Sequence, residues 1–253
     1  MYCKTVFITG ATSGIGRACA NLFAKELRYN LILCGRREER LQELQNELSE
    51  FAKIHTLKFD VRNRSEVENA IQSLPAEFTQ IDILINNAGN AHGLDPIDSA
   101  LMDDIEAMVD INLKGLLYVS KAIIPSMIAR KAGHIINVGS LAGKEVYPNG
   151  AVYCASKFAV DALNRGMRMD LNSYGIKVSI INPGMVETEF SLVRFKGDYE
   201  KAKSVYRGLT PLAADDIAQT ILFVATRPPH VNLADIIVLP NAQASASIVK
   251  REA

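Results

Sequence analysis

Short apolar runs alternate with longer helical patterns along almost the whole chain, and this alternation constrains the fold more than any other feature. Nearly continuous apolar runs rich in valine, isoleucine and leucine are typical of parallel strands that helices cover on both faces. Seven such runs occur, at residues 5–8, 31–34, 54–59, 81–85, 134–138, 177–181 and 236–239. Helical periodicity fills the intervals between them, at residues 14–26, 38–50, 64–74, 102–129, 152–174 and 215–226.

Strict alternation of strand and helix predicts right-handed crossovers and a doubly wound parallel sheet. We therefore expect a Rossmann-type α/β fold of about seven strands with helices on both faces. The sequence has no Pro/Gly/Ser-rich linker, no low-complexity segment and no repeat, so residues 1–253 are expected to form one domain. Residues 189–212 interrupt the alternation, and an insertion of this length in a compact fold is usually a lid or a binding loop.

The composition excludes several classes of protein. The chain has 253 residues, 48% of them apolar, and its 28 basic side chains balance 28 acidic ones. This apolar content excludes intrinsic disorder, and zero net charge argues against a protein that coats nucleic acid. No apolar stretch is long enough to span a bilayer, and the N-terminal run is too short for a signal peptide. We expect a cytoplasmic protein with no membrane or nucleic-acid partner.

The cysteines and histidines show no metal-binding pattern. The four cysteines are scattered, at Cys3, Cys19, Cys34 and Cys154, without a CxxC pair. A chain of this length needs no disulfide to fold, so we interpret them as buried free thiols rather than as two bridges. The four histidines are dispersed without ligand spacing, and no metal site is expected.

A glycine-rich turn joins the first expected strand to the first expected helix, reading TGATSGIG at residues 9–16. Glycines permit a tight turn and a close approach to a pyrophosphate, which the free N–H groups of the helix N-terminus then hold. The motif alone is also consistent with a simple strand–helix turn. Its place between the first strand and the first helix favours a dinucleotide site. The spacing is GxxxGxG rather than GxGxxG.

With this glycine spacing the sequence resembles the short-chain dehydrogenase/reductase family, whose first turn reads TGxxxGxG. Further family motifs match in order over about residues 5–240: NNAG at 86–89, Asn112 in a helix, Ser140 after the fifth strand, the YxxxK pair Tyr153 and Lys157, and Pro183-Gly184 after the sixth strand. The resemblance implies a catalytic set of Asn112, Ser140, Tyr153 and Lys157. It also implies cofactor contacts from Gly10, Thr12, Ser13, Gly14, Ile15, Gly16, Arg36, Arg37, Asp60, Val61, Asn87, Ala88, Gly89, Tyr153, Lys157, Pro183, Gly184, Val186 and Thr188.

The spacing of the YxxxK pair fits acid–base chemistry. Positions i and i+4 lie on one face of a helix, so the ammonium of Lys157 is expected to lower the pKa of the Tyr153 hydroxyl. In the family, the lysine also reaches the nicotinamide ribose, the serine binds the substrate oxygen, and the asparagine anchors a water of the proton relay. YxxxK alone is also consistent with an ordinary surface pair, and the presence of Ser140 and Asn112 favours the catalytic interpretation.

The end of the second strand predicts the choice of cofactor. Enzymes that prefer NAD usually place an acidic residue there, to accept hydrogen bonds from the ribose 2′-hydroxyl. This chain has Arg36 and Arg37 instead, and the next acid is Glu38 in the following helix. Two guanidinium groups suit a 2′-phosphate, so we expect NADP. The alternative is that both arginines form only the solvated first turn of a helix, where cations are disfavoured.

Segments 35–41, 60–64 and 189–198 resemble one branch of the family, the NADP-dependent 3-hydroxy acid dehydrogenases, which act on serine, allo-threonine and small 3-hydroxy acids and reduce malonic semialdehyde. The resemblance implies hydride transfer between NADP(H) and such an acid, whose oxygen would lie between Ser140 and Tyr153. The carboxylate then needs a cation, and the insertion offers Arg194, with Lys196 as second choice. Alternatively, both cations only solvate a surface loop.

Other interpretations stay open. A 3-oxoacyl-carrier-protein reductase, or another small-carbonyl ketoreductase, would share the catalytic set. A catalytically silent NADP-sensing regulator would share the cofactor site but has no need of the proton relay. The resemblance also implies a homo-oligomer, a tetramer in much of the family, built on the two long apolar helices expected at residues 102–129 and 152–174.

Overall fold

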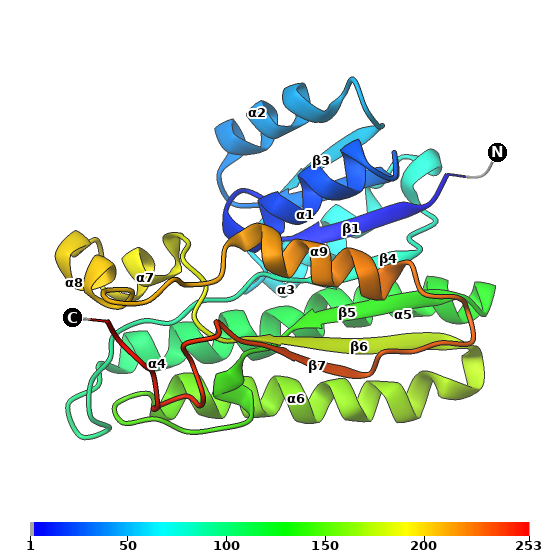
Figure 1. The fold of residues 1–253 in the computed structure, drawn as a ribbon. Coiled ribbons are helices and arrows are strands. Elements are labelled where there is room, and N and C mark those ends of the chain that lie inside the picture. The colour runs from blue at the N-terminus through cyan, green and yellow to red at the C-terminus, as the bar shows by residue number, and fades with distance from the viewer. Residues whose placement is uncertain (1–2, 253) are drawn as a thin grey trace.

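The computed structural model describes residues 3–252, which contain one parallel sheet in the order β3-β2-β1-β4-β5-β6-β7 (Figure 1). Every neighbouring pair of strands runs parallel. The strand order reverses between β1 and β4, and in such sheets ligands bind beyond the carboxyl ends of the strands at this point. The strands are β1 Thr5–Thr9, β2 Asn30–Gly35, β3 Ile54–Lys58, β4 Ile83–Asn86, β5 Gly133–Val138, β6 Ile176–Pro183 and β7 Asp235–Val238. The expected Rossmann-type fold is confirmed.

Helices cover both faces of the sheet because successive strand side chains point to opposite sides. Val6 and Ile8 of β1 pack against α1, α2 and α9, whereas Phe7 packs against the layer of α3, α5 and α6. Figure 1 shows α1 and α9 in front of the sheet and α3 and α5 behind it. The helices are α1 Gly14–Lys25, α2 Glu38–Leu48, α3 Arg64–Gln72, α4 Met102–Val109, α5 Leu116–Arg130, α6 Ala151–Leu171, α7 Glu189–Arg194, α8 Tyr199–Ser204 and α9 Ala214–Ala225. Short 3-10 turns lie at Ala76–Phe78, Leu141–Gly143 and Asn172–Tyr174.

The helix expected at residues 102–129 is interrupted, which corrects the sequence prediction. A π-helical segment, Asp110–Gly115, separates α4 from α5 and carries Asn112. The side chain of Asn112 donates to the carbonyl of Asn90 (2.8 Å) and to Ser156 Oγ (3.0 Å), and it accepts from the Asn90 N–H (2.9 Å). π-Helical turns within α-helices are frequent at functional sites, and here the widened turn accompanies the side-chain contacts of one buried asparagine.

The insertion at residues 189–212 contains α7 and α8, which lie on the left of Figure 1, at the carboxyl ends of the strands. The last described residues of the chain pack on it. Arg251 donates to the carbonyls of Val205 and Arg207, and the Glu252 N–H donates to the carbonyl of Gly208. The insertion is therefore held by residues from the far end of the chain.

Two further expectations are tested by the fold. All four cysteines are free thiols, and Cys19, Cys34 and Cys154 are buried as expected. Cys3 is exposed, because it precedes β1 at the surface, and this corrects the expectation of four buried thiols. In residues 3–252, no helix has both the length and the apolar character needed to cross a membrane.

Candidate active site

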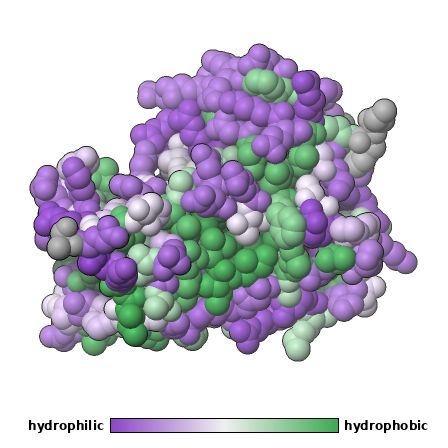
Figure 2. Space-filling model, viewed as in Figure 1, coloured by the Kyte–Doolittle hydropathy of each residue, from purple (hydrophilic) through white to green (hydrophobic). Residues whose placement is uncertain are grey.

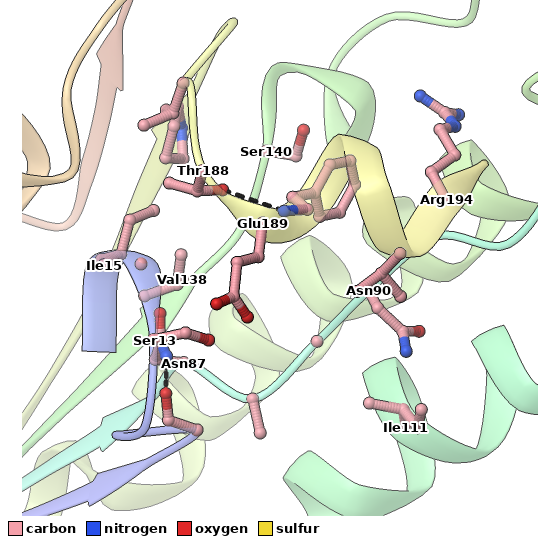
Figure 3. A pocket seen from close by; sticks show the side chains of 18 of the residues that line it. Ser13, Ile15, Asn87, Asn90, Ile111, Val138, Ser140, Thr188, Glu189 and Arg194 are labelled. Carbon is pink, nitrogen blue, oxygen red and sulfur yellow. Dashed lines mark hydrogen bonds between the residues drawn. The ribbon is translucent and has the colours of Figure 1, made fainter. Parts of the chain in front are cut away.

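A cavity of about 500 Å³ opens beyond the carboxyl ends of the strands (Figure 3). This volume lies within the range of roughly 300–1,000 Å³ that ligand sites occupy. The glycine-rich turn, the ends of β2, β4, β5 and β6, the start of α6, and α7 all contribute to its wall. Strands fix one side of the cavity and the insertion closes the other, so cofactor and substrate would meet between them.

The glycine-rich turn has the geometry of a phosphate cradle. Gly10 and Gly14 have positive φ angles of 65° and 49°, which favour glycine, and a Cβ atom on Gly16 would lie 2.3 Å from the carbonyl oxygen of Gly10. The N-cap residue of α1, Ser13, makes no side-chain capping bond. The first N–H groups of α1 are therefore available to an anion, and these residues fit a dinucleotide.

Two arginines lie where an NAD-preferring site carries an acid. Arg37 is the N-cap of α2 although its side chain has no acceptor, and it donates to Thr12 Oγ1 and Ser13 Oγ at 3.0–3.3 Å. Arg36 lies 3.6 Å from the carboxylate of Asp60. Both guanidinium groups line the cavity, so this end of it fits a 2′-phosphate.

Glu38, the first residue of α2, is the acid that follows the two arginines, and it does not reach the cavity. Glu38 forms an ion pair with Lys58 (2.6 Å) and is not among the cavity-lining residues. Partial burial raises the pKa of Asp60, but its hydrogen bonds with Arg62 outweigh this effect and hold the pKa below its usual value. Asp60 is therefore ionised at neutral pH, and it already has arginine partners.

Tyr153 and Lys157 lie one turn apart on α6, and both are more than nine-tenths buried. Lys157 Nζ donates to the carbonyl of Val138 (3.1 Å), the last residue of β5. Burial lowers the pKa of Lys157 to about 8. Ser140 follows β5 as the N-cap of a 3-10 turn, and its hydroxyl works to lower the pKa of Tyr153. The strand end and the helix thus bring three predicted catalytic side chains to one wall of the cavity.

The electrostatics of Tyr153 differ from the sequence expectation. Burial raises the pKa of its hydroxyl above the ordinary tyrosine value. The groups that lower it are the Ser140 hydroxyl and the guanidinium of Arg194, rather than the Lys157 ammonium that the YxxxK spacing suggested. The reason is local, since Lys157 Nζ is held at the carbonyl of Val138.

Asn112 is placed behind the cavity wall rather than on it. Its side chain is 2% exposed and bonds to the backbone of Asn90, which does line the cavity. Asn112 therefore contacts the cavity wall through the backbone of Asn90, and its own side chain does not line the cavity.

Of the two cations suggested as substrate anchors, Arg194 lines the cavity and Lys196 does not. Arg194, the last residue of α7, lines the cavity with its guanidinium carbon 5.4 Å from the ring centroid of Tyr153. Its Nη2 donates to the Tyr147 hydroxyl (2.6 Å) and its Nε to the carbonyl of Gly93 (3.1 Å). Lys196 is not among the cavity-lining residues and forms an ion pair with Asp104 at 2.8 Å, which corrects its suggestion as a second anchor.

The remaining predicted cofactor residues lie largely where they were expected. Gly16 alone is not on the cavity wall, because it packs against the backbone of Gly10. The predicted cofactor contacts that line the cavity are Gly10, Thr12, Ser13, Gly14, Ile15, Arg36, Arg37, Asp60, Val61, Asn87, Ala88, Gly89, Tyr153, Lys157, Pro183, Gly184, Val186 and Thr188. Figure 3 shows the Ser13 and Asn87 side chains together at one end and Ser140 at the other.

Sequence reasoning missed several side chains that line the cavity: Tyr147, Glu189, Tyr206 and Gln243. Gln243 accepts from the Met185 N–H (2.9 Å), and Tyr206 donates to the carbonyl of Val186 (2.8 Å). Both therefore reach the loop after β6 from distant parts of the chain. No spacing rule in the sequence marks such contacts.

Comparison with known proteins agrees with this geometry. The sequence profile of the family described as short chain dehydrogenase matches residues 4–198. The NADP-dependent 3-hydroxy acid dehydrogenase YdfG of Salmonella typhi is 45% identical over 244 residues, which are 96% of this chain and 97% of the relative. Sulfoacetaldehyde reductase 2 of Chromohalobacter salexigens is 45% identical over 249 residues, 98% of both chains.

A solved structure of serine dehydrogenase, described as the closed form complexed with NADP+, is also similar. It has a TM-score of 0.92 and 42% identity, covering 98% of this chain and 100% of that one. The serine dehydrogenase of Escherichia coli has a TM-score of 0.82 and 38% identity, covering 95% of this chain and 99% of that one. The matching motifs, the sheet order and these relatives together show that the chain belongs to the short-chain dehydrogenase/reductase family.

Proposed function

We propose that the chain is an NADP-dependent oxidoreductase that transfers hydride between NADP(H) and a small 3-hydroxy acid, such as serine, allo-threonine or the 3-hydroxypropionate/malonic semialdehyde pair. Relatives with 3-hydroxy acid dehydrogenase and serine dehydrogenase names support this activity. NADP, when bound, accepts the hydride in oxidation and supplies it in reduction. The protein has to bind and orient the cofactor and the substrate, and to exchange a proton with the substrate.

The preference for NADP is supported by the charge at the carboxyl end of β2. Arg36 and Arg37 both line the cavity, and they follow β2 where an enzyme that prefers NAD usually carries an acidic residue. The planar donor fork of arginine matches the geometry of a phosphate. Ser13, which lies 3.0 Å from Arg37, adds a hydroxyl donor to the same site.

The proton chemistry is assigned to Tyr153 and Ser140. In oxidation, the Tyr153 oxygen takes the proton of the substrate hydroxyl, and in reduction its hydroxyl returns one. Ser140, whose hydroxyl works to lower the pKa of Tyr153, orients the substrate oxygen between the two. Lys157 would hold the ribose of a bound NADP, and Asn112 fixes the Asn90 backbone from behind the wall. Burial raises the pKa of Tyr153, whereas the Ser140 hydroxyl and, to a smaller extent, the Arg194 guanidinium work to lower it.

One observation carries the substrate assignment. The guanidinium of Arg194 lies over the Tyr153 ring at 5.4 Å and faces the same cavity as Ser140. A 3-hydroxy acid has one carbon between its carboxylate and the reacting carbon, so a cation at this separation is suitably placed to bind the carboxylate. Phe190, whose ring centroid lies 5.6 Å from that of Tyr153, supplies an apolar wall. A sulfonate in place of the carboxylate would use the same cation.

A panel of carbonyl compounds, three aldehydes and one 3-oxoacyl thioester, tests this assignment against the two alternatives. Purified protein is given NADPH with malonic semialdehyde, sulfoacetaldehyde, propanal or an acetoacetyl thioester, and oxidation of NADPH is followed by absorbance. We expect the anionic aldehydes to react with the highest kcat/KM. Preference for the thioester would indicate a carrier-protein reductase. NADPH binding without turnover of any substrate would indicate a silent regulator.

Assembly and location are also proposals. We propose a homo-oligomer, with a tetramer as the expected form, in the cytoplasm. Figure 2 shows apolar side chains gathered over β7 and the neighbouring part of the sheet, and Ile237 on β7 is 49% exposed. Light scattering coupled to size-exclusion chromatography measures the assembly, and a monomer at micromolar concentration would contradict it. Cell fractionation tests the location.

A further inference from the structure

One carboxylate ties the cofactor half of the cavity to the substrate half. Glu189, the first residue of α7, accepts from Arg37 Nη1 (2.9 Å) through Oε2 and from Arg40 Nη1 (2.7 Å) through Oε1. Glu189 lines the cavity, and Figure 3 shows its carboxylate pointing from α7 toward the Ser13 side. The three residues come from segments about 150 positions apart, so their meeting is a feature of the folded chain.

The partners of Arg37 define what an incoming phosphate must displace. Its Nε and Nη2 donate to the neutral hydroxyls of Thr12 and Ser13, while its Nη1 donates to Glu189. Among the described residues, Glu189 is the only carboxylate paired with Arg37 or with Arg40. Arg36 is separately matched with Asp60. The positive charge at this end of the cavity is therefore partly neutralised by two of the protein's own acids, Asp60 and Glu189.

Glu189 is ionised at neutral pH. Partial burial works to raise its pKa, and the hydrogen bonds from Arg37 and Arg40 outweigh that effect, so the pKa lies below the ordinary value. The ion pair is also accessible, with Arg37 and Glu189 side chains 43% and 42% exposed. Exposed ion pairs are weak, whereas a phosphate monoester carries about −1.5 to −2 charges and three acceptor oxygens. A 2′-phosphate is thus the stronger partner for Arg37.

We propose that Glu189 competes with the 2′-phosphate of NADP for Arg37, and so limits both the affinity for NADP and its preference over NAD. The inference rests on the proposed NADP dependence. NAD has no 2′-phosphate, so its binding leaves the Glu189–Arg37 pair in place. NADP has to break that pair, which leaves Arg40 as the remaining ion-pair partner of Glu189 and so loosens the start of α7, the helix that ends at Arg194.

The primary test uses Glu189→Gln, which removes the charge and keeps the size. We expect the Kd of NADP, measured by calorimetry, to fall about two- to fivefold, since the one exposed ion pair that NADP displaces is worth at most about fivefold. The Kd of NAD should change less than about twofold, because no group of NAD competes with Glu189. Glu187→Gln is the matched control: it removes the same charge two residues earlier, from an exposed side chain with no ion pair in the described part of the chain. It should leave both Kd values unchanged.

Three results would overturn the proposal. NADP binding that is unchanged or weaker in Glu189→Gln would show that the carboxylate does not compete. An equal gain for NAD, or an equal gain in Glu187→Gln, would show a general charge effect. Thermal unfolding of each variant establishes that it is folded. If the unaltered protein bound NADP no more tightly than NAD, the proposed cofactor preference itself would fail, which is a separate outcome.

A second measurement tests the release of α7. Adenosine 2′,5′-bisphosphate carries the 2′-phosphate but no nicotinamide, so it does not reach the substrate half of the cavity. We expect it to speed hydrogen exchange of the α7 amides in the unaltered protein, whereas ADP, which lacks the 2′-phosphate, should not. In Glu189→Gln, exchange at these amides should already be fast without ligand. Unchanged or slower exchange with the bisphosphate would refute the link to α7.

Discussion

Replacing Arg194 by alanine should remove the carboxylate anchor while leaving the proton chemistry in place. Arg194 Nη1 makes no hydrogen bond within the described part of the chain, and Nη2 has one bond, to Tyr147. One or two charge-assisted hydrogen bonds to a substrate carboxylate are therefore available, worth together about 2–4 kcal/mol. At 1.4 kcal/mol per factor of ten, kcat/KM for 3-hydroxypropionate should fall by roughly 30- to 1,000-fold.

The assay compares this acid with propane-1,3-diol, which has the reacting alcohol but no charge. Loss of the guanidinium over the Tyr153 ring should lower kcat/KM for the diol by less than about fivefold, because a cation–π contact is worth about 0.5–1 kcal/mol. Lys196→Ala is the control variant, since that ammonium pairs with Asp104 and is not among the cavity-lining residues. It should change neither substrate strongly. Equal losses for acid and diol in Arg194→Ala would refute the anchor.

Three further variants test the other parts of the site. Tyr153→Phe should lower kcat by about 100-fold or more while the Kd of NADP stays within a few-fold, and retention of more than about a tenth of kcat would contradict the acid–base assignment. Arg36→Asp should weaken NADP binding far more than NAD binding, because it adds repulsion toward the 2′-phosphate. Equal losses of affinity for the two cofactors would show that Arg36 does not bind the 2′-phosphate. Lys157 has a folded pKa of about 8 against 10.5 unfolded, so the unfolded chain binds more protons between these values and the stability due to Lys157 rises with pH there. Denaturant unfolding of the unaltered protein and of Lys157→Met should therefore give a difference in unfolding free energy that rises by about 3 kcal/mol from pH 8 to pH 10.5. A difference that stays constant with pH would refute the lowered pKa of the buried lysine.

The sheet and most helix limits were predictable because they depend on local patterns. The run at residues 31–34 became β2 Asn30–Gly35, with Leu31 and Leu33 on one face and Ile32 on the other. The break in the helix expected at 102–129 was not predictable. The apolar pattern continues through the π-helical segment, and the contacts of Asn112 with Asn90 and Ser156 exist only in the folded chain.

The candidate site likewise has a part that the sequence predicts and a part that it does not. Side chains at the ends of strands, such as Ser140 and Arg36, were predictable because parallel strands end at one edge of the sheet. Contacts made by the insertion were not. Arg194 reaches Tyr147 over 47 positions and Glu189 reaches Arg37 over 152, and no local signal encodes such pairs. The same limit explains why Lys196, equally cationic in the sequence, was wrongly suggested as an anchor.

The most direct test of the proposed function is the steady-state oxidation of 3-hydroxypropionate and of serine with NADP and, separately, with NAD. Formation of reduced nicotinamide is followed by absorbance with purified protein. The account predicts turnover of these acids with NADP, and a kcat/KM at least about tenfold higher with NADP than with NAD, which corresponds to about 1.4 kcal/mol from the 2′-phosphate site. Absence of turnover, or equal rates with the two cofactors, would contradict it.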